Sequence, residues 1–194
     1  MADLIPLSWL HTVSESRPYV GASYGISSLD PNQTGRTGPQ YTVQNNRSVG
    51  NVYAGLENGA WAVEIGGGPL ADRRSHNVSS TYDIKQNISA DHIYLAALRK
   101  FRLMDKLSAH AKLGVARVMF KNHEFGSNEN GPNQTQLNYG TDTVPIYGAG
   151  LEAVINKNLS LRLEAERLDR LIKSHWTRPH SDISKVSAGL KYKF

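Results

Sequence analysis

Cysteine is absent from this chain of 194 residues, which excludes disulfides, thiolate metal sites and cysteine nucleophiles. Long apolar runs are absent too, so the sequence predicts no membrane-spanning helix. A transmembrane barrel remains open, because its strands need only about 9–11 residues with one apolar face. The negative mean hydropathy is compatible with such a barrel, and the length predicts a single domain.

A basic excess is present, since 22 Lys and Arg residues face 17 Asp and Glu residues. We nevertheless expect no nucleic-acid binding, because the basic residues are spread through the chain and no nucleic-acid motif appears. The start of the chain does not read as a secretory signal: Met1 to Asp3 carries no basic residue, and Pro6 breaks a short apolar stretch. We expect that a signal has been removed from an exported form, although a cytoplasmic protein can begin in the same way.

Eight segments with alternating apolar and polar residues follow one another along the chain. They cover residues 17–28, 47–57, 60–69, 89–103, 107–121, 143–155, 159–173 and 182–194. Residues 1–16 precede them and contain Trp9, a residue that favours a membrane interface. We expect residues 1–16 to form a periplasmic or interfacial segment, with ordinary N-terminal disorder as an equal alternative, and residues 17–194 to form one domain.

The connectors between these segments alternate in length. Residues 57–59, 104–106 and 156–158 are short, whereas 30–39, 70–88 and 122–142 are long and polar, and 174–181 is intermediate. Short turns at one end and long loops at the other are typical of an outer-membrane barrel, whose short turns face the periplasm. The sequence therefore predicts an all-β fold, an eight-stranded antiparallel up-and-down transmembrane barrel with long extracellular loops.

In most of the segments one face is apolar throughout, and the other mixes glycine with charge. Glycines on the polar face suit a narrow, crowded lumen, which predicts that the apolar face points outward to lipid. A soluble barrel of the lipocalin kind, with the apolar face inward, is the alternative. Arg99 interrupts the outward face near a short turn, where it can extend its head towards water.

The last strand, residues 186–194, alternates without a break and ends on an aromatic residue. Together with residues 17–25, 60–64, 95–114 and 147–152, it resembles the OmpA-type family of eight-stranded outer-membrane β-barrels. The resemblance implies a location in the bacterial outer membrane, with lipid and lipopolysaccharide as neighbours. It also implies that Leu190, Tyr192 and Phe194 form the signal that the barrel-assembly machinery recognises. OmpA proper has a periplasmic peptidoglycan-binding domain after its barrel, and we expect no such function here.

Charged residues of both signs fall on the inward face. Because buried charges must pair to offset desolvation, we expect a lumen network of Glu64, Lys100, Arg102, Lys112, Glu152, Arg162, Glu164, Glu166, Lys185, Lys191 and Lys193. Eight strands leave an interior that side chains just fill, so we expect an occluded lumen. A narrow passive pore for small solutes or ions, in which the partners exchange, is the alternative.

Seven histidines raise the question of an enzyme, since some eight-stranded outer-membrane barrels modify lipid A. Such chemistry needs His and Ser close together on one face of a strand, and the sequence contains no pair in the order His-x-Ser. We expect no catalytic residue, no cofactor and no metal, and keep a lipid A-modifying enzyme as a second alternative.

The expected role is structural or surface-interactive, through adhesion or lipopolysaccharide contact. We expect a monomer whose long loops present any surface ligand site. Four basic residues are candidates for lipopolysaccharide phosphates: Arg73, Arg74, Lys85 and Lys121.

Overall fold

A computed structural model describes residues 16–31, 42–44, 46–78, 82–128, 131–169 and 181–194. Within these ranges the chain forms nine strands and no helix. They are β1 (Arg17–Pro31), β2 (Thr42–Gln44), β3 (Asn46–Asn58), β4 (Trp61–Val78), β5 (Tyr82–Met104), β6 (Leu107–Asn128), β7 (Gly131–Val154), β8 (Leu159–Leu168) and β9 (Ser181–Lys193). The predicted all-β class is confirmed.

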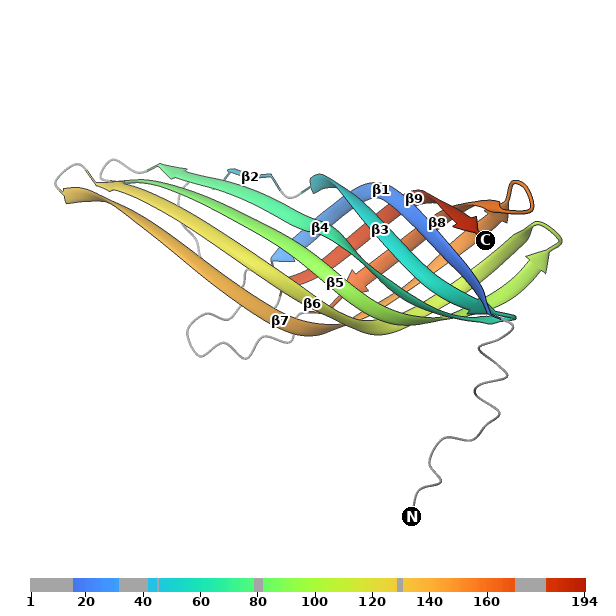
Figure 1. Cartoon of the computed structure of the whole chain (residues 1–194). Helices are drawn as coiled ribbons and strands as arrows, with labels where there is room; N and C mark the ends of the chain where they lie inside the picture. Colours follow the sequence, from blue (N-terminus) through green and yellow to red (C-terminus); the bar gives the residue numbers. More distant parts are fainter. Residues whose placement is uncertain (1–15, 32–41, 45, 79–81, 129–130, 170–180) are drawn as a thin grey trace, which may run out of the picture.

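Eight of these strands close into an antiparallel barrel (Figure 1), in the order β1-β3-β4-β5-β6-β7-β8-β9. The seam that closes it joins β1 to β9, from Tyr19 opposite Lys193 to Pro31 opposite Ser181. The short strand β2 pairs with β4 at Arg74–His76, beyond the point where the pairing of β3 with β4 ends at Val52 and Gly67. Each pairing is antiparallel, as the up-and-down prediction requires.

The short turns lie together at one end of the barrel, where Phe194 N–H donates to Pro18 O at 3.1 Å. Gly59 has a φ of 56°, which lets the Asn58–Gly59 turn close tightly because glycine carries no Cβ. In the β7–β8 turn, Asn156 Oδ1 accepts hydrogen bonds from the N–H groups of Asn158 and Leu159, at 3.0 and 2.8 Å. Local turn chemistry therefore sets the register at this end.

At the other end the predicted loop boundaries are wrong. Residues 70–88 and 122–142, expected as long loops, continue largely as strands: β4 and β5 pair out to Val78 and Asp83, and β6 and β7 out to Asn128 and Gly131. These ribbons project past the rest of the barrel in Figure 1. Outside the membrane both faces of a ribbon meet water, so the strands lose the alternation by which sequence analysis recognises them. Strand β8 ends at Leu168 rather than at residue 173.

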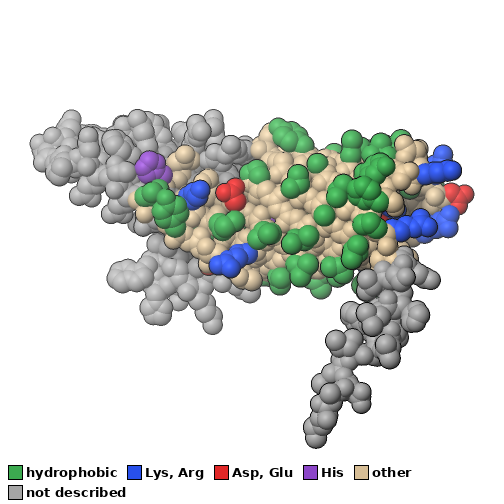
Figure 2. Space-filling view, viewed as in Figure 1, with side chains coloured by type: hydrophobic (Ala, Val, Ile, Leu, Met, Phe, Trp, Pro, Cys, Tyr) green, Lys and Arg blue, Asp and Glu red, His purple; other side chains and the backbone are tan. Residues whose placement is uncertain are grey.

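The predicted faces are those observed. Along β8 buried and exposed residues alternate without a break, and Leu113, Val52 and Val186 are among many apolar side chains exposed on the outside. Figure 2 shows apolar side chains distributed over the barrel wall. On β6 the outward apolar residues run from Leu107 to Val115, about the 9 residues that a tilted strand needs to cross a bilayer. An apolar exterior of this extent fits lipid rather than water, which excludes the lipocalin alternative.

Arg99 is half-buried on this outer wall. Its guanidinium lies over the Trp61 ring, 4.8 Å from the ring centre, on the neighbouring strand β4. A cation over an aromatic face is stabilised by the ring quadrupole. The Trp61 ring therefore stabilises the Arg99 charge on the otherwise apolar outer wall.

Candidate functional site

The lumen contains two groups of charged side chains at different levels. We call the group nearer the short turns the turn-end cluster: Glu57, Lys100, Glu152, Lys191 and Lys193. Glu57 contacts the amino groups of all three lysines, at 2.6 Å for Lys100, 2.5 Å for Lys191 and 3.0 Å for Lys193. Glu152 lies 3.1 Å from both Lys100 and Lys191 and 3.8 Å from Lys193. Two carboxylates are thus shared among three lysines.

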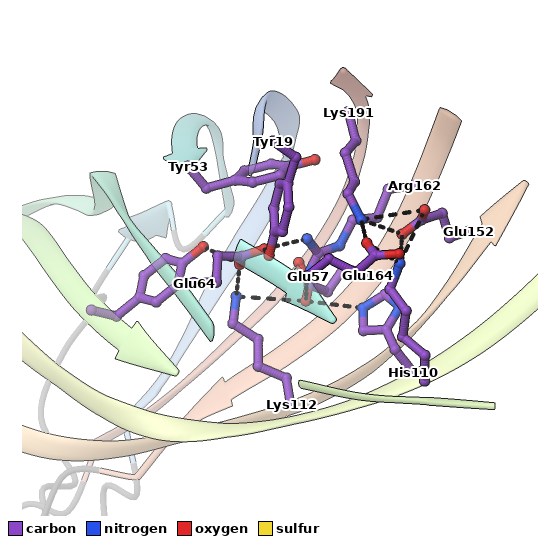
Figure 3. A network of polar contacts seen from close by, with 12 residues as sticks. Tyr19, Tyr53, Glu57, Glu64, His110, Lys112, Glu152, Arg162, Glu164 and Lys191 are labelled. Atoms are coloured by element: carbon purple, nitrogen blue, oxygen red, sulfur yellow. Dashed lines mark hydrogen bonds and ion pairs between the residues drawn. The ribbon is translucent and has the colours of Figure 1, made fainter. Parts of the chain in front are cut away.

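The second group, the middle cluster, consists of Glu64, His110, Lys112, Arg162, Glu164, Glu166 and Lys185. Arg162 joins two of its carboxylates, with nitrogens 2.5 Å from Glu64 Oε2 and 2.7 Å from Glu164 Oε1. The guanidinium also lies over the Tyr53 ring, 4.9 Å from its centre. Figure 3 shows Arg162 between these partners.

Lys112 connects the rest of the middle cluster. Its Nζ lies 2.5 Å from Glu166, 3.1 Å from Glu64 and 3.5 Å from Glu164, and 3.9 Å from the centre of the Tyr94 ring. Glu166 also pairs with Lys185. The three carboxylates are therefore matched by three permanent cations, as low-dielectric surroundings require.

Two tyrosine hydroxyls complete the coordination of Glu64, and a histidine contacts Glu164. Tyr19 donates its hydroxyl hydrogen to Glu64 Oε2 at 3.0 Å, and Tyr94 donates to Oε1 at 2.8 Å. His110 Nε2 lies 3.3 Å from Glu164 Oε1, and its ring is packed against Gly150, where a Cβ would come within 2.5 Å of it. The lumen at this level is filled by side chains that touch one another.

A third layer, on the outer side of the middle cluster, is apolar. We call it the outer plug: Leu70, Val118, Val144, Ile146, Leu168 and Ile183. Each of these side chains is buried, and they come from β4, β6, β7, β8 and β9, so they converge on the lumen from most of its circumference. Among the described residues, the lumen thus holds a layer of hydrocarbon side chains as well as two levels of ion pairs.

The structure places all the residues of the predicted lumen network, except one, in the two clusters. Arg102 is the exception: its side chain is 75 % exposed and pairs with Asp105 at 3.0 Å in the β5–β6 turn. The register of β5 shifts between Arg102 and Met104, and the strand there has reached the mouth of the barrel. Assigning Arg102 to the lumen network is therefore wrong.

Sequence reasoning missed Glu57, His110 and the tyrosines. The sequence places Glu57 in the turn with Asn58 and Gly59, yet it lies two residues from Gly55 and four from Tyr53, on the inward face of β3. Continuing the alternation to the end of the strand identifies it. His110 and Tyr19 fall on the polar face, but neither carries a permanent charge, so the pairing of charges does not identify them.

Of the predicted lipopolysaccharide contacts, Lys121 is exposed on β6. The side chains of Arg73, Arg74 and Lys85 lie outside the described residues. Around Lys121, on the outward face of β6 and β7, the structure places exposed Arg117, His123 and Tyr139. We call these four residues the rim patch; Figure 2 shows basic and histidine side chains near this end of the visible face.

The terminal residues Leu190, Tyr192 and Phe194 point outward and are exposed, with the Tyr192 and Phe194 rings in edge contact 5.2 Å apart. Among the described residues no group of three His, Cys, Asp or Glu side chains is placed to hold a metal ion. The described part of the chain also contains no helix long and apolar enough to cross a membrane.

A closed antiparallel barrel with an apolar outer band and a charged interior is the architecture of a bacterial outer-membrane protein. A family model, the OmpA-like transmembrane domain, matches residues 14–194, and the chain belongs to this family. A comparison with curated protein sequences gives no match.

Solved structures with a similar fold include Ail of Yersinia pestis in complex with the heparin analogue sucrose octasulfate, at 16% identity, with 93% of this chain and 99% of that chain covered and a TM-score of 0.56. OprG of Pseudomonas aeruginosa gives 12% identity, 92% and 96% coverage and a TM-score of 0.57. A major outer membrane protein of Thermus thermophilus gives 13% identity, 90% and 99% coverage and a TM-score of 0.59. The family and the fold place this chain in the outer membrane.

Proposed function

We propose that this protein is an occluded outer-membrane barrel with a structural or surface-interaction role, and that it is not an enzyme. The observation that carries the proposal is the double closure of the lumen, by the ion-paired clusters and by the outer plug. Because charged and apolar side chains fill both levels of the lumen among the described residues, we infer that the outer ribbons and the lipid-facing wall are the surfaces that act.

Planar bilayer recording with pure refolded protein tests the closure. We expect no stable conductance from the wild-type barrel. Opening both closures in one variant, with Ile146→Gly and Leu168→Gly in the plug and Arg162→Gly in the middle cluster, should produce conducting events, because these three side chains are buried in the lumen. Stable, large conductance from the wild type would instead support a pore.

A narrow passive pore is the second candidate, and one observation favours it. Lys112 lies within 3.5 Å of three carboxylates, so it can change partner without leaving a charge unpaired. An ion path that opens by such exchange still has to pass the outer plug, where apolar constrictions dewet. Voltage-dependent events that persist in the wild type and change in Lys112→Met would favour the pore.

The rim patch supports contact with lipopolysaccharide phosphates. Arg117 and Lys121 lie on the same face of β6, beyond the apolar band that ends at Val115. Exposed cations at this level meet the phosphates of the outer leaflet, with which Arg and Lys form charge-assisted hydrogen bonds. An adhesion ligand with anionic groups would meet the same four residues.

The midpoint of thermal unfolding in vesicles with and without lipopolysaccharide tests the rim patch. We expect lipopolysaccharide to raise the midpoint of the wild type and to raise it less in the Arg117→Ala, Lys121→Ala double variant. Lys106→Ala, in the short turn at the opposite end, is the matched control and should behave as the wild type. Equal midpoint shifts in both variants would contradict the proposed contact.

Mass spectrometry of lipid A from a host that expresses the chain tests the absence of enzyme activity. We expect the number of acyl chains on lipid A to be the same with and without expression. The histidines that the structure describes in the lumen, His92 and His110, are buried, and an external lipid does not reach His110. A clear change in acyl number would favour the lipid A-modifying enzyme instead.

A further inference from the structure

The turn-end cluster carries more positive than negative charge. Its three lysines, Lys100, Lys191 and Lys193, share the carboxylates of Glu57 and Glu152. The middle cluster, by contrast, matches three carboxylates with three permanent cations. The described part of the lumen therefore holds one positive charge in excess, at the level next to the short turns. Burial of such a charge is costly unless an anion compensates it.

Lys193 is the member of the turn-end cluster that a ligand can reach. Its side chain is 23% exposed, whereas that of Lys191 is 1% exposed and hydrogen-bonds to both carboxylates. With the described residues, Lys193 Nζ makes a single hydrogen bond, to Glu57 Oε1 at 3.0 Å. Glu152 Oε1, at 3.8 Å, is beyond hydrogen-bond distance. An ammonium group has three N–H donors, so two of them remain for a ligand at the mouth of the barrel.

Arg17 adds a second cation at the same place. It is the first residue of β1, it is exposed, and it lies directly opposite Glu57 on β3. The oxygens of Glu57 already contact three lysines, and Arg17 forms no ion pair within the described ranges. Lys193 lies opposite Tyr19, two residues further along β1. Such diagonal neighbours are about 7–8 Å apart, within reach of long side chains.

The β7–β8 turn adds a third cation on this side of the mouth. Asn158 Nδ2 donates to Lys193 O at 2.7 Å, and Lys193 N–H donates to Asn158 O at 2.8 Å. These bonds hold the turn against the end of β9, and the exposed Lys157 directly precedes Asn158. Figure 2 shows Lys and Arg side chains gathered at the short-turn end of the barrel. We call Arg17, Lys157 and Lys193 the mouth site.

We propose that the mouth site binds one phosphate group at the periplasmic end of the barrel. Together, the turn-end cluster and the mouth site contain five cations against three anions, if the carboxylate of Phe194 is counted with the two glutamates. Inorganic phosphate and phosphate monoesters carry about 1.5–2 negative charges at neutral pH, which matches this excess. Their oxygens accept charge-assisted hydrogen bonds from guanidinium and ammonium groups. Because the short turns face the periplasm, the phosphate comes from periplasmic solution or from a headgroup of the periplasmic leaflet.

Isothermal titration calorimetry of the refolded full chain in a non-ionic detergent tests the mouth site. Inorganic phosphate is the probe, and chloride keeps the ionic strength constant. We expect one phosphate to bind per chain, and Arg17→Gln and Lys193→Gln each to weaken binding about tenfold, the factor for one charge-assisted hydrogen bond. Lys106→Gln is the matched control, because it removes the same charge from the β5–β6 turn on the opposite side of the barrel. It should bind as the wild type does. No binding by the wild type, or equal weakening in all three variants, would overturn the proposal.

A second measurement separates the two sources of the phosphate. The midpoint of thermal unfolding is compared in phosphatidylcholine vesicles alone, with added phosphatidylglycerol, and with added inorganic phosphate. A rise with phosphatidylglycerol that is larger in the wild type than in Arg17→Gln assigns the site to a lipid headgroup. Such a difference with inorganic phosphate alone assigns it to the free anion. The gel shift between boiled and unboiled samples verifies that each variant is folded. Equal midpoints of the wild type and Arg17→Gln under every condition would overturn the proposal.

Discussion

Arg162 binds three partners from different strands in the middle of the lumen: Glu64 on β4, Glu164 on its own strand and the Tyr53 ring on β3. Its side chain is 3% exposed. A buried ion pair contributes little over an apolar substitute, but breaking one leaves a charge unpaired. Arg162 therefore matters to the stability of the barrel mainly because its loss would leave Glu64 and Glu164 buried without their shortest cation contacts.

We expect Arg162→Ala to lower the free energy of unfolding by about 3–5 kcal/mol, because Glu64 and Glu164 lose their shortest cation contacts. Urea titration in lipid vesicles, followed by tryptophan fluorescence, measures the loss. Arg102→Ala is the control, since Arg102 is exposed at the barrel mouth, and its effect should be within about 1 kcal/mol. A similar loss in both variants would contradict the placement of Arg162 in a buried network.

Individual residues also show where sequence reasoning succeeds and where it stops. Strand parity places Glu64 and Lys112 in the lumen, because side-chain direction alternates strictly along a strand. The alternation predicts the wrong direction for the Arg102 side chain, because the register shifts and the strand ends close to it. No pattern in the sequence indicates either feature. Which carboxylate pairs with which cation depends on the stagger of distant strands, and no local pattern encodes it.

At the scale of strands, the outward face of β6 indicates which residues lie in the apolar core of the membrane. Ala111 is the middle of the outward apolar residues from Leu107 to Val115, and Met119 lies beyond them. We expect Ala111→Arg to cost about 2–4 kcal/mol and Met119→Arg about 0–1 kcal/mol, as for charges at the midplane and at the interface. Unfolding titrations in vesicles measure both, and equal costs would show that the apolar band is placed wrongly.

Two glycines in β7, Gly150 and Gly140, are expected to affect stability in opposite ways when replaced by alanine. A Cβ at Gly150 would collide with Leu163 O and lie 2.5 Å from the His110 ring, whereas one at Gly140 meets nothing within 4 Å. We expect Gly150→Ala to destabilise the barrel by about 1–3 kcal/mol through overpacking. Gly140→Ala should be neutral or stabilising by up to about 1 kcal/mol. The reverse order, measured by urea titration, would contradict the packing of His110 against β7.

The strands themselves could be predicted within the membrane and not beyond it. From Leu107 to Val115 the bilayer requires alternation, so the sequence shows it. From residue 122 onward β6 continues through polar residues that obey no such requirement. The outer plug was equally hidden, because Val118, Val144 and Ile146 look like ordinary strand residues until the strands bring them together.

For the whole molecule, the predicted barrel implies a compact form that survives in detergent. We expect the unboiled protein to migrate faster than the boiled protein on a gel, because eight closed strands unfold together or not at all. The wild type and each variant above can be checked in this way. Equal migration, together with solubility in the absence of detergent, would contradict a transmembrane barrel.

The proposed assembly signal is tested at the same scale. We expect Phe194→Ala to slow insertion into vesicles that contain the purified barrel-assembly machinery, with a smaller effect on equilibrium stability. Phe101→Ala is the matched control, since Phe101 is also an outward aromatic near the short turns, and it should leave the insertion rate unchanged. If both variants slow insertion equally, the terminal position of Phe194 has no special part in recognition.

The seam between β1 and β9 sets the order in which the chain can fold. The other barrel interfaces join strands that follow one another around the barrel in chain order, so each is a contact of low order that forms early. The seam alone joins the first strand to the last, and until it forms both strands present open edges with unpaired N–H and C=O groups. A nearly complete sheet is thus the most aggregation-prone species during folding. Pairing of β1 with β9, the last step, removes this risk because it leaves no open strand edge.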